Sequence, residues 1–206
     1  MKVRNIKQRV VITGMGALTA LGLSVEETWS GLVAGRSGIG KITHFDADFM
    51  PIRIAGEVKG FDPTDYIPRK EARRMSRASQ LAMGSGTQAM ADAGLGDQVP
   101  DPERSGIIMG TGIGGFDEGL NGWETFQKKG LKRVNPFKAM AMLCNLPAHY
   151  VSTRFQCQAY SSTVVTACAA GTQAIGEAAE VIRRGDADLM LAGGVEGVVH
   201  PVVVGA

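Results

Sequence analysis

Short apolar runs alternate along the chain with longer segments that have helical spacing. Several of the apolar runs are rich in β-branched residues and end in glycines, which is typical of buried strands. Five runs are expected to be strands: Arg9–Gly14, Ile52–Val58, Ser105–Thr111, Ser162–Ala167 and Asp188–Gly193. Strands that alternate with helical segments predict an α/β protein whose sheet is covered by helices.

The segments between these runs carry helix signals. Ser24 lies three residues before Glu27, which is the spacing of a capping box at a helix start. Gly94 follows a helical stretch and is a natural stop for it, whereas Pro147 requires a turn or a kink. The helical segments are expected at 24–34, 63–92, 116–129, 139–154 and 169–184.

Composition narrows the class of protein. The 206 residues are 44% hydrophobic and 20% charged, as in an ordinary globular chain, so disorder and a collagen-like repeat are excluded. The net charge of +2 is too balanced for a nucleic-acid binder without a cluster of charge. No apolar run approaches the ~18 residues of a membrane-spanning helix. The odd count of three cysteines favours a reducing compartment, most simply the cytoplasm.

Cys168 is the strongest candidate for chemistry. It follows a β-branched strand and precedes a helix of small residues, so it is expected among the unpaired N–H groups at the positive end of that helix. This position favours the thiolate, which is the nucleophilic form, and the backbone N–H groups of the turn could stabilise an oxyanion. The alternative from spacing alone is a buried structural cysteine, which is also the interpretation of Cys144 and Cys157.

A basic stretch is the second feature. Lys70, Arg73, Arg74 and Arg77 recur at intervals of three and four, which predicts that they share one side of a helix. Such a face can be simply solvated, or it can attract an acidic partner. Nucleic acid is the weaker interpretation, because the rest of the chain is not basic.

The histidines do not join either feature. No sequence motif places one of them beside Cys168, and their spacing implies no metal site. They are expected to be structural or exposed: His44, His149 and His200.

The segment Val165–Gly171 resembles the nucleophile motif of the β-ketoacyl-acyl carrier protein synthases, the condensing enzymes of fatty acid synthesis. The resemblance covers essentially the whole chain and is greatest to the type II elongating synthases. Further matching motifs occur in the same order and spacing: Arg9–Gly16, Arg73–Arg77, Gly110–Gly115, and Gly185–Asp188 leading to Ala192–Gly194 with Glu196.

The resemblance implies roles for particular residues. Cys168 would accept an acyl chain from the phosphopantetheine thiol of the carrier, and its N–H would form part of the oxyanion hole. Ile113 would line and gate the acyl pocket, and Leu143 would line the same pocket. No cofactor of the enzyme's own is implied, because substrates arrive as phosphopantetheine thioesters. The carrier-docking positions would be Lys70, Arg73, Arg74, Lys132 and Arg133.

The resemblance also implies a fold and an assembly. The fold would be thiolase-like α/β, in which two halves pack as αβαβα layers and subunits form a homodimer. Residues 1–206 would be the N-terminal half, a single β-ketoacyl synthase domain with one mixed five-stranded sheet and flanking helices. The apolar ending after Gly194 also favours a chain that continues or assembles with a second half. That half would supply two histidines and a lysine for decarboxylative Claisen condensation of malonyl-carrier.

Two departures and two alternatives accompany this prediction. Gln156–Ser161 replaces a Gly-x-x-Gly-Pro turn, and Lys138 replaces an apolar position near the partner subunit's pocket. One alternative is a non-catalytic chain-length or scaffold subunit, although such subunits usually lack the cysteine. The other is a polyketide condensing enzyme or a thiolase. The substrate would distinguish these activities, because it is either a carrier-bound malonyl group or an acyl-CoA.

Overall fold

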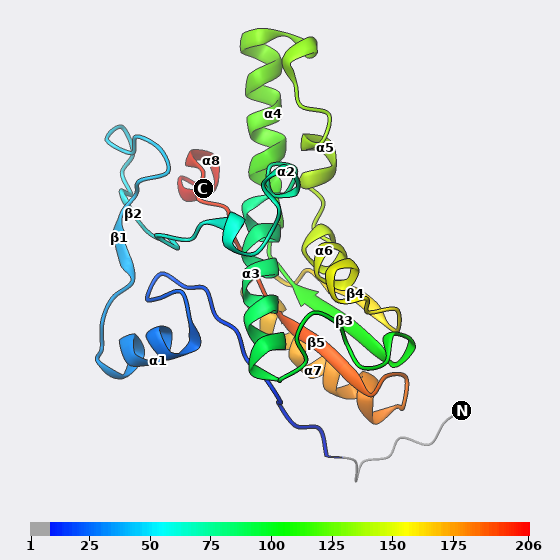
Figure 1. The fold of residues 1–206 in the computed structure, drawn as a ribbon. Helices are drawn as coiled ribbons and strands as arrows, with labels where there is room; N and C mark the ends of the chain where they lie inside the picture. Colours follow the sequence, from blue (N-terminus) through cyan, green and yellow to red (C-terminus); the bar gives the residue numbers. More distant parts are fainter. Residues whose placement is uncertain (1–8) are drawn as a thin grey trace.

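The computed structural model describes residues 9–206 (Figure 1). Its centre is a parallel sheet in which β3 (Ser105–Gly110) lies between β4 (Ser161–Val164) and β5 (Leu189–Gly194). Helix α7 (Ala170–Arg183) covers one face, whereas α3 (Arg77–Asp92) and α6 (Leu146–Phe155) lie over the other (Figure 1). The described part of the chain is therefore α/β with helices on both faces of the sheet.

Strand β3 is buried along its whole length, as its apolar sequence predicts. Its side chains alternate between two cores: Ile107 and Met109 pack with α3 and α6, whereas Ile108 packs with α7. The face of α7 against the sheet carries small buried residues at helical spacing, Ala170, Ala174, Ala178 and Val181. These small side chains let the helix lie close to the strands.

The carboxyl ends of all three parallel strands meet at one edge of the sheet. Gly110 of β3 is in register with Val164 of β4 and with Gly194 of β5. The first turn of α7 approaches this edge so closely that a Cβ on Gly110 would lie 2.2 Å from the carbonyl oxygen of Ala170. The residues that follow the three strands are thereby brought together.

The N-terminal part lies to one side of the central sheet (Figure 1). Helix α1 (Val25–Val33) begins as predicted, since the Glu27 N–H donates to Ser24 Oγ at 3.1 Å. It is followed by an antiparallel pair, β1 (Ile39–Lys41) and β2 (Ile54–Gly56). Strand β1 has only three residues and was not predicted, whereas β2 lies within the longer predicted run Ile52–Val58.

The predicted first strand, Arg9–Gly14, is wrong: the structure assigns no strand there. Val11 and Ile12 are 64% and 76% exposed. The chain just beyond it lies along α3 instead, where the Met15 N–H donates to Asp92 Oδ2 at 2.8 Å. The prediction of one mixed five-stranded sheet is corrected with it, because the five strands of residues 9–206 form a three-stranded parallel sheet and a separate two-stranded one.

The remaining elements are short apart from α4. The expected helix over 139–154 is divided into two, with a break at 142–145 ahead of Pro147, which lies in the first turn of α6. Helix α4 rises away from the sheet and the chain returns beside it to α5 (Figure 1). The elements not described above are η1 (Pro63–Asp65), α2 (Arg69–Ala72), η2 (Pro102–Arg104), α4 (Phe116–Lys129), η3 (Leu131–Arg133), α5 (Lys138–Ala141), η4 (Ala167–Ala169) and α8 (Pro201–Val204).

Many large apolar side chains are exposed on the described residues. They occur on α1, α4 and α7, and they include Trp29, Trp123 and Ile175. Across residues 9–206, every helix is too short or too polar to cross a bilayer.

Candidate functional site

The site lies where the parallel strands end, and Cys168 is at its centre. After β4 the chain enters an exposed loop, 165–169, that turns directly into α7. Ala167, just before the cysteine, has φ of +50°, a left-handed conformation that an alanine adopts at a cost. Cys168 is a free, exposed thiol. The alternative that it is a buried structural cysteine is therefore wrong.

The loop is braced from its own helix. The Thr166 hydroxyl donates to Gln173 Oε1 at 2.9 Å, and Gln173 Nε2 donates to Glu177 Oε1 at 2.7 Å. The Glu177 carboxylate thus orients the amide of Gln173, and the oxygen of that amide accepts the hydrogen bond from the Thr166 hydroxyl. This chain of hydrogen bonds ties the start of the loop to the second turn of α7.

The glycine-rich turn after β3 lies beside this loop. A Cβ on Gly112 would be 3.8 Å from Ala167 Cα, so the turn and the loop are neighbours. Gly114 has φ of +59°, and a Cβ there would lie 2.7 Å from Cys144 Cα. The turn therefore requires glycine, both for its backbone conformation and because it is pressed between the Cys168 loop and the segment after α5.

Glu196, just beyond β5, holds the same turn. Its Oε2 accepts hydrogen bonds from the Gly112 N–H at 2.8 Å, the Ile113 N–H at 3.1 Å and the Thr111 hydroxyl at 3.5 Å. Thr111 Oγ1 in turn accepts the Gly114 N–H at 3.0 Å. The residues after all three strands are thus joined at one edge of the sheet.

The two predicted acyl-pocket residues lie on adjacent segments. Ile113 is on the glycine-rich turn and Leu143 follows α5, and their chain neighbours Gly114 and Cys144 are in contact. Both side chains are partly open to solvent, at 36% and 43% exposed. The structure brings the two segments together, and the lining of an acyl pocket by these residues stays a prediction.

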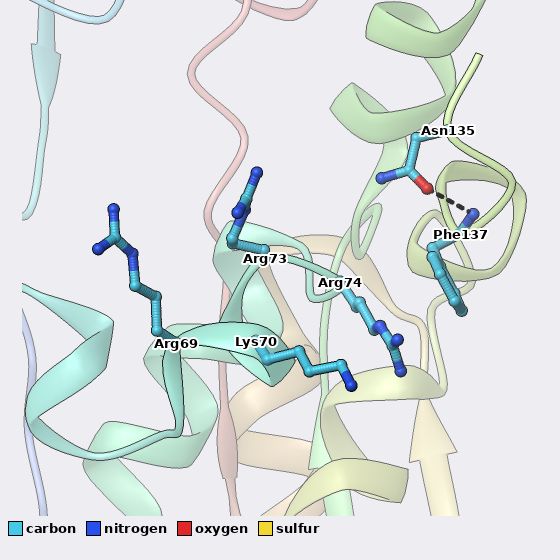
Figure 2. Close-up of a pocket in the computed structure, with 6 residues that line it drawn as sticks. All are labelled: Arg69, Lys70, Arg73, Arg74, Asn135 and Phe137. Atoms are coloured by element: carbon cyan, nitrogen blue, oxygen red, sulfur yellow. Dashed lines mark hydrogen bonds between the residues drawn. The ribbon is translucent and has the colours of Figure 1, made fainter. Parts of the chain in front are cut away.

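The basic stretch forms a cleft next to α5. Its volume is about 500 Å³, and Figure 2 shows basic side chains from α2 and the residues after it around the opening. The Arg74 guanidinium stacks over the Phe137 ring at 4.4 Å, and Asn135 Oδ1 accepts the Phe137 N–H at 3.0 Å. The lining residues are Arg69, Lys70, Arg73, Arg74, Asn135 and Phe137.

The prediction that one helix side carries Lys70, Arg73, Arg74 and Arg77 is wrong. Helix α2 ends before Arg73, and a new helix, α3, begins at Arg77. Arg77 points inward, stacks over Phe61 at 4.7 Å and donates to the Val58 carbonyl at 3.2 Å. Burial lowers the pKa of the Arg77 guanidinium, and this side chain is not part of the basic cleft.

Lys132 and Arg133 do not line the cleft. They lie in η3, at the far end of α4 (Figure 1). Both side chains are exposed. The structure therefore divides the five predicted docking residues into three at the cleft and two on η3, and their role in docking stays a prediction.

Cys144 packs against the glycine-rich turn, whereas Cys157 and the histidines have other surroundings. Cys157 is buried, and burial raises the pKa of its thiol to about 11. His44 and His149 are exposed, whereas His200 Nδ1 accepts the Val202 N–H at the start of α8. Within residues 9–206, no group of His, Cys, Asp and Glu is arranged to hold a metal ion.

The structure shows the surroundings of the two departures from the family pattern. Gln156 ends α6 with φ of +62°, the conformation that glycine adopts most readily at a helix end. Lys138 forms an ion pair with Glu118 between α5 and α4. The lysine charge is therefore neutralised within the chain.

Sequence reasoning missed several parts of the site. Arg69 could have been included because it begins the same basic stretch. The contact of Phe137 with Arg74 joins segments more than sixty residues apart, and no spacing in the sequence indicates it. Glu196 was recognised within a motif, but its hydrogen bonds to the turn after β3 follow only from the parallel register of β3 and β5.

Comparison with known proteins agrees with this geometry. Residues 7–206 match the family described as Beta-ketoacyl synthase, N-terminal domain. The chain is 39% identical over 196 residues to a 3-oxoacyl-[acyl-carrier-protein] synthase 2 of Synechocystis sp., covering 95% of this chain and 47% of that protein. It is 39% identical over 199 residues to the synthase 2 of Staphylococcus aureus, covering 96% and 48%. The chain therefore spans about half the length of these curated relatives.

Three solved structures are similar. The ishigamide ketosynthase/chain length factor superposes with a TM-score of 0.84 at 31% identity, covering 96% of this chain and 49% of that one. A beta-ketoacyl synthase from Burkholderia phymatum has a TM-score of 0.81 at 35% identity, with coverage of 96% and 49%. A type II polyketide synthase acyl-carrier protein in complex with its ketosynthase bound to the hexaketide gives 0.79 at 28%, with coverage of 95% and 53%.

These matches extend over nearly the whole chain and agree with one another on the fold. The fold is thiolase-like α/β, and this chain forms its N-terminal half. The chain belongs to the beta-ketoacyl synthase family.

Proposed function

We propose that this chain is the nucleophile-bearing half of a β-ketoacyl-[acyl carrier protein] synthase of fatty acid chain elongation. The observation that carries the proposal is Cys168: an exposed thiol after a residue with left-handed backbone, at the start of α7 and at the carboxyl edge of a parallel sheet. Nucleophiles of acyl-transfer enzymes occupy such strand–turn–helix junctions, where substrate can reach the reacting atom.

In the first step the Cys168 thiolate attacks the carbonyl carbon of an acyl thioester. The new C–S bond forms as the carbonyl π electrons move to oxygen, and the oxyanion is stabilised by backbone N–H groups near the start of α7. Collapse of this intermediate breaks the bond to the carrier's sulfur, and the phosphopantetheine thiol leaves after it takes up a proton. The chain then holds the acyl group as a thioester on Cys168.

Condensation follows on this acyl-enzyme. Malonyl-carrier loses carbon dioxide, and its carbanion attacks the carbonyl carbon of the Cys168 thioester. The new C–C bond forms, the C–S bond to Cys168 breaks, and the Cys168 thiolate leaves, so the product is a free β-ketoacyl-carrier longer by two carbons. In the proposal a second half of the synthase supplies the histidines and lysine for decarboxylation. None of the described histidines is assigned to this step, because no hydrogen bond or ion pair of the described residues joins one of them to the Cys168 loop. No cofactor beyond the phosphopantetheine of the carrier is proposed.

We propose that an acidic acyl carrier protein docks on the basic cleft and on η3. The cleft combines four cationic side chains with the face of Phe137, and η3 adds Lys132 and Arg133. Opposite-sign surfaces mainly raise the association rate and fix orientation, and salt weakens them. A related structure is of an acyl-carrier protein in complex with its ketosynthase, which supports a partner of this kind.

The complete enzyme is proposed as a cytoplasmic homodimer in which the second half covers apolar residues of this chain. Exposed side chains such as Ile12 and Ile175 support a covering partner, since large apolar surfaces are rarely left open on soluble proteins. The free state of all three cysteines supports a reducing compartment.

The test measures acyl transfer from a purified acyl-carrier thioester to the protein. The protein is used in the form that its native source produces. Cys168→Ser is expected to lose more than about 99% of the transfer rate, because a serine hydroxyl without a strong base is a far weaker nucleophile than a thiolate. Cys157→Ser is the matched control. It replaces a buried free thiol outside the site and is expected to keep transfer within about threefold. Full transfer in Cys168→Ser would refute the proposal.

Docking has its own test. The double variant Arg73→Glu/Arg74→Glu reverses two charges at the cleft and is expected to slow carrier association about 10-fold or more at low salt. The difference from the unmodified protein is expected to shrink as salt rises. Lys59→Glu is the control, because Lys59 is also exposed but does not line the cleft. Equal losses in the two variants would contradict carrier docking at the cleft.

The first alternative is a non-catalytic chain-length subunit, a kind of protein found with the ishigamide ketosynthase among the similar structures. The exposed position of Cys168 favours the catalytic interpretation over this one. The transfer assay separates them, because a chain-length subunit would not become acylated.

A further inference from the structure

Glu196 joins two ends of the sheet in a way that the proposed chemistry does not use. It follows β5, whereas its three hydrogen-bond donors follow β3. One oxygen, Oε2, accepts from the N–H groups of Gly112 and Ile113 and from the Thr111 hydroxyl. No other hydrogen bond within the described residues is assigned to these two N–H groups. A carboxylate that accepts backbone N–H groups makes charge-assisted bonds, which are stronger than neutral ones.

The turn that Glu196 holds has little room to move on its other sides. A Cβ on Gly114 would lie 2.7 Å from Cys144 Cα, and one on Gly115 would lie 2.1 Å from the Ala141 carbonyl oxygen. Toward the Cys168 loop the contact is looser, since a Cβ on Gly112 would lie 3.8 Å from Ala167 Cα. Ile113, whose N–H binds the carboxylate, projects a partly exposed apolar side chain from the same turn.

We propose that Glu196 is a positioning residue that fixes the glycine-rich turn and so sets where the Ile113 side chain meets the acyl chain bound to Cys168. The inference rests on the proposed function. It deepens that function by assigning selectivity for acyl-chain length to a carboxylate that touches neither the thiol nor the substrate. Loss of the carboxylate frees two backbone N–H groups, so the turn can shift and Ile113 no longer blocks or guides chains of one length.

Three variants separate the effect of the Glu196 charge from that of its hydrogen bonds and of the space beside its carboxylate. Glu196→Ala removes all three hydrogen bonds. Glu196→Gln keeps a carbonyl oxygen that can accept from the same N–H groups but removes the charge. Gly112→Ala keeps the carboxylate but places a Cβ 2.8 Å from Glu196 Oε2, which pushes that oxygen away from the turn. Glu103→Gln is the matched control, because it removes one exposed carboxylate near the opposite edge of the sheet.

The experiment measures single-turnover acylation of Cys168 from carrier thioesters of graded chain length, together with the rate at which iodoacetamide alkylates Cys168. Glu196→Ala and Gly112→Ala are expected to change the ratio of acylation rates between preferred and disfavoured lengths by about tenfold. Glu196→Gln is expected to stay within about threefold and Glu103→Gln to match the unmodified protein. Alkylation is expected to stay within about twofold throughout, because the thiol and its loop keep their place.

Hydrogen exchange gives a readout that does not depend on catalysis. The amides of Gly112 and Ile113 are expected to exchange faster in Glu196→Ala and to be nearly unchanged in Glu196→Gln. If the unmodified protein acylates Cys168 but Glu196→Ala keeps both the length profile and slow exchange, this inference alone is overturned. If the unmodified protein never acylates Cys168, the proposed function fails and the inference fails with it.

Discussion

Gly110→Ala tests whether the packing of α7 on the sheet positions the nucleophile. Gly110 is the last residue of β3, and the first turn of α7 lies directly against it. A Cβ at this position would lie 2.2 Å from the Ala170 carbonyl oxygen, 2.3 Å from the Ala170 carbonyl carbon and 2.7 Å from the Gly171 nitrogen. All three atoms are backbone, so no side-chain rotation can relieve the overlap.

The size of the effect follows from these contacts. Ordinary contact between such atoms needs roughly 3.5 Å, so the start of α7 must move by about 1 Å. Overpacking of a core by one methyl group typically costs about 1–3 kcal/mol of unfolding free energy. Because Cys168 lies two residues before Ala170, a 1 Å displacement there is expected to reduce acyl transfer about 100-fold.

Gly86→Ala is the matched control. A Cβ on this glycine, in the middle of α3, would lie 3.5 Å from Val151 Cγ1 and 3.6 Å from a Phe155 ring carbon, which are ordinary contacts. The same chemical change is therefore expected to stabilise the protein by about 0.5–1 kcal/mol, since alanine is the better helix former, and to leave acyl transfer unchanged.

Urea unfolding followed by circular dichroism gives the stabilities, and single-turnover acylation gives the rates. The predicted order of unfolding midpoints is Gly86→Ala, the unmodified protein, then Gly110→Ala. Acylation of Gly110→Ala within threefold of the unmodified rate, with an unchanged midpoint, would refute the reasoning that the close approach of α7 fixes the nucleophile.

Three further predictions concern other parts of the chain. At pH 8 iodoacetamide is expected to modify exposed Cys168 and to spare Cys157 in the native protein. Burial raises the pKa of the Cys157 thiol to about 11, so only about one Cys157 side chain in a thousand is a thiolate at this pH. Peptide mass mapping measures the labelling, and equal labelling of the two cysteines would contradict this expectation. Burial acts to raise the pKa of Glu57, but hydrogen bonds from Thr43 and His44 outweigh it and hold this pKa below 4.5. The stabilising contribution of Glu57 is therefore present above its unfolded-state pKa and is lost as the pH falls through the lower folded-state pKa. The urea midpoint is expected to fall less between pH 5 and pH 3 in Glu57→Gln than in the unmodified protein. The same fall in both proteins would count against this role of Glu57. Gln156→Gly is expected to raise the unfolding free energy by up to about 1 kcal/mol, since φ of +62° costs glutamine more than glycine, and a loss of stability in thermal melts would oppose this account.

The central sheet was predictable because its strands are strongly marked. Ser105–Gly110 is rich in apolar and β-branched residues and ends in glycine, so the predicted strand ends only one residue beyond the observed one. Helix α4 was predicted with its observed bounds, since Gly115 and Gly130 flank it. These local signals act over a few residues and need no knowledge of distant contacts.

The errors lie where distant contacts decide the structure. Arg9–Gly14 has the composition of a strand, yet strand formation needs a hydrogen-bonding neighbour, and the residues that follow it bind to α3 instead. Arg77 has the spacing of a helix face, but the chain between Arg73 and Arg77 turns, and the Arg77 guanidinium packs on Phe61. Periodicity identifies a face only where one helix is continuous.

The candidate site was predictable only where neighbouring residues in the sequence determine it. Cys168 could be placed at a strand–helix junction from its neighbours alone. The contact of Gly114 with Cys144 and the hydrogen bonds of Glu196 could not, because each joins segments far apart in the chain. The left-handed backbone of Ala167 has no signal in the neighbouring residues, since alanine rarely adopts it.

Cys168 is proposed to receive the acyl group, and peptide mass mapping of the acyl-enzyme is the decisive measurement of this step. The protein is incubated with an acyl-carrier thioester, quenched in acid and digested, and each cysteine-containing peptide is examined for the mass of the acyl chain. One acyl group is expected on the peptide with Cys168 and none on those with Cys144 or Cys157. An acyl group on another residue, or no acylation under conditions where the carrier binds, would contradict it.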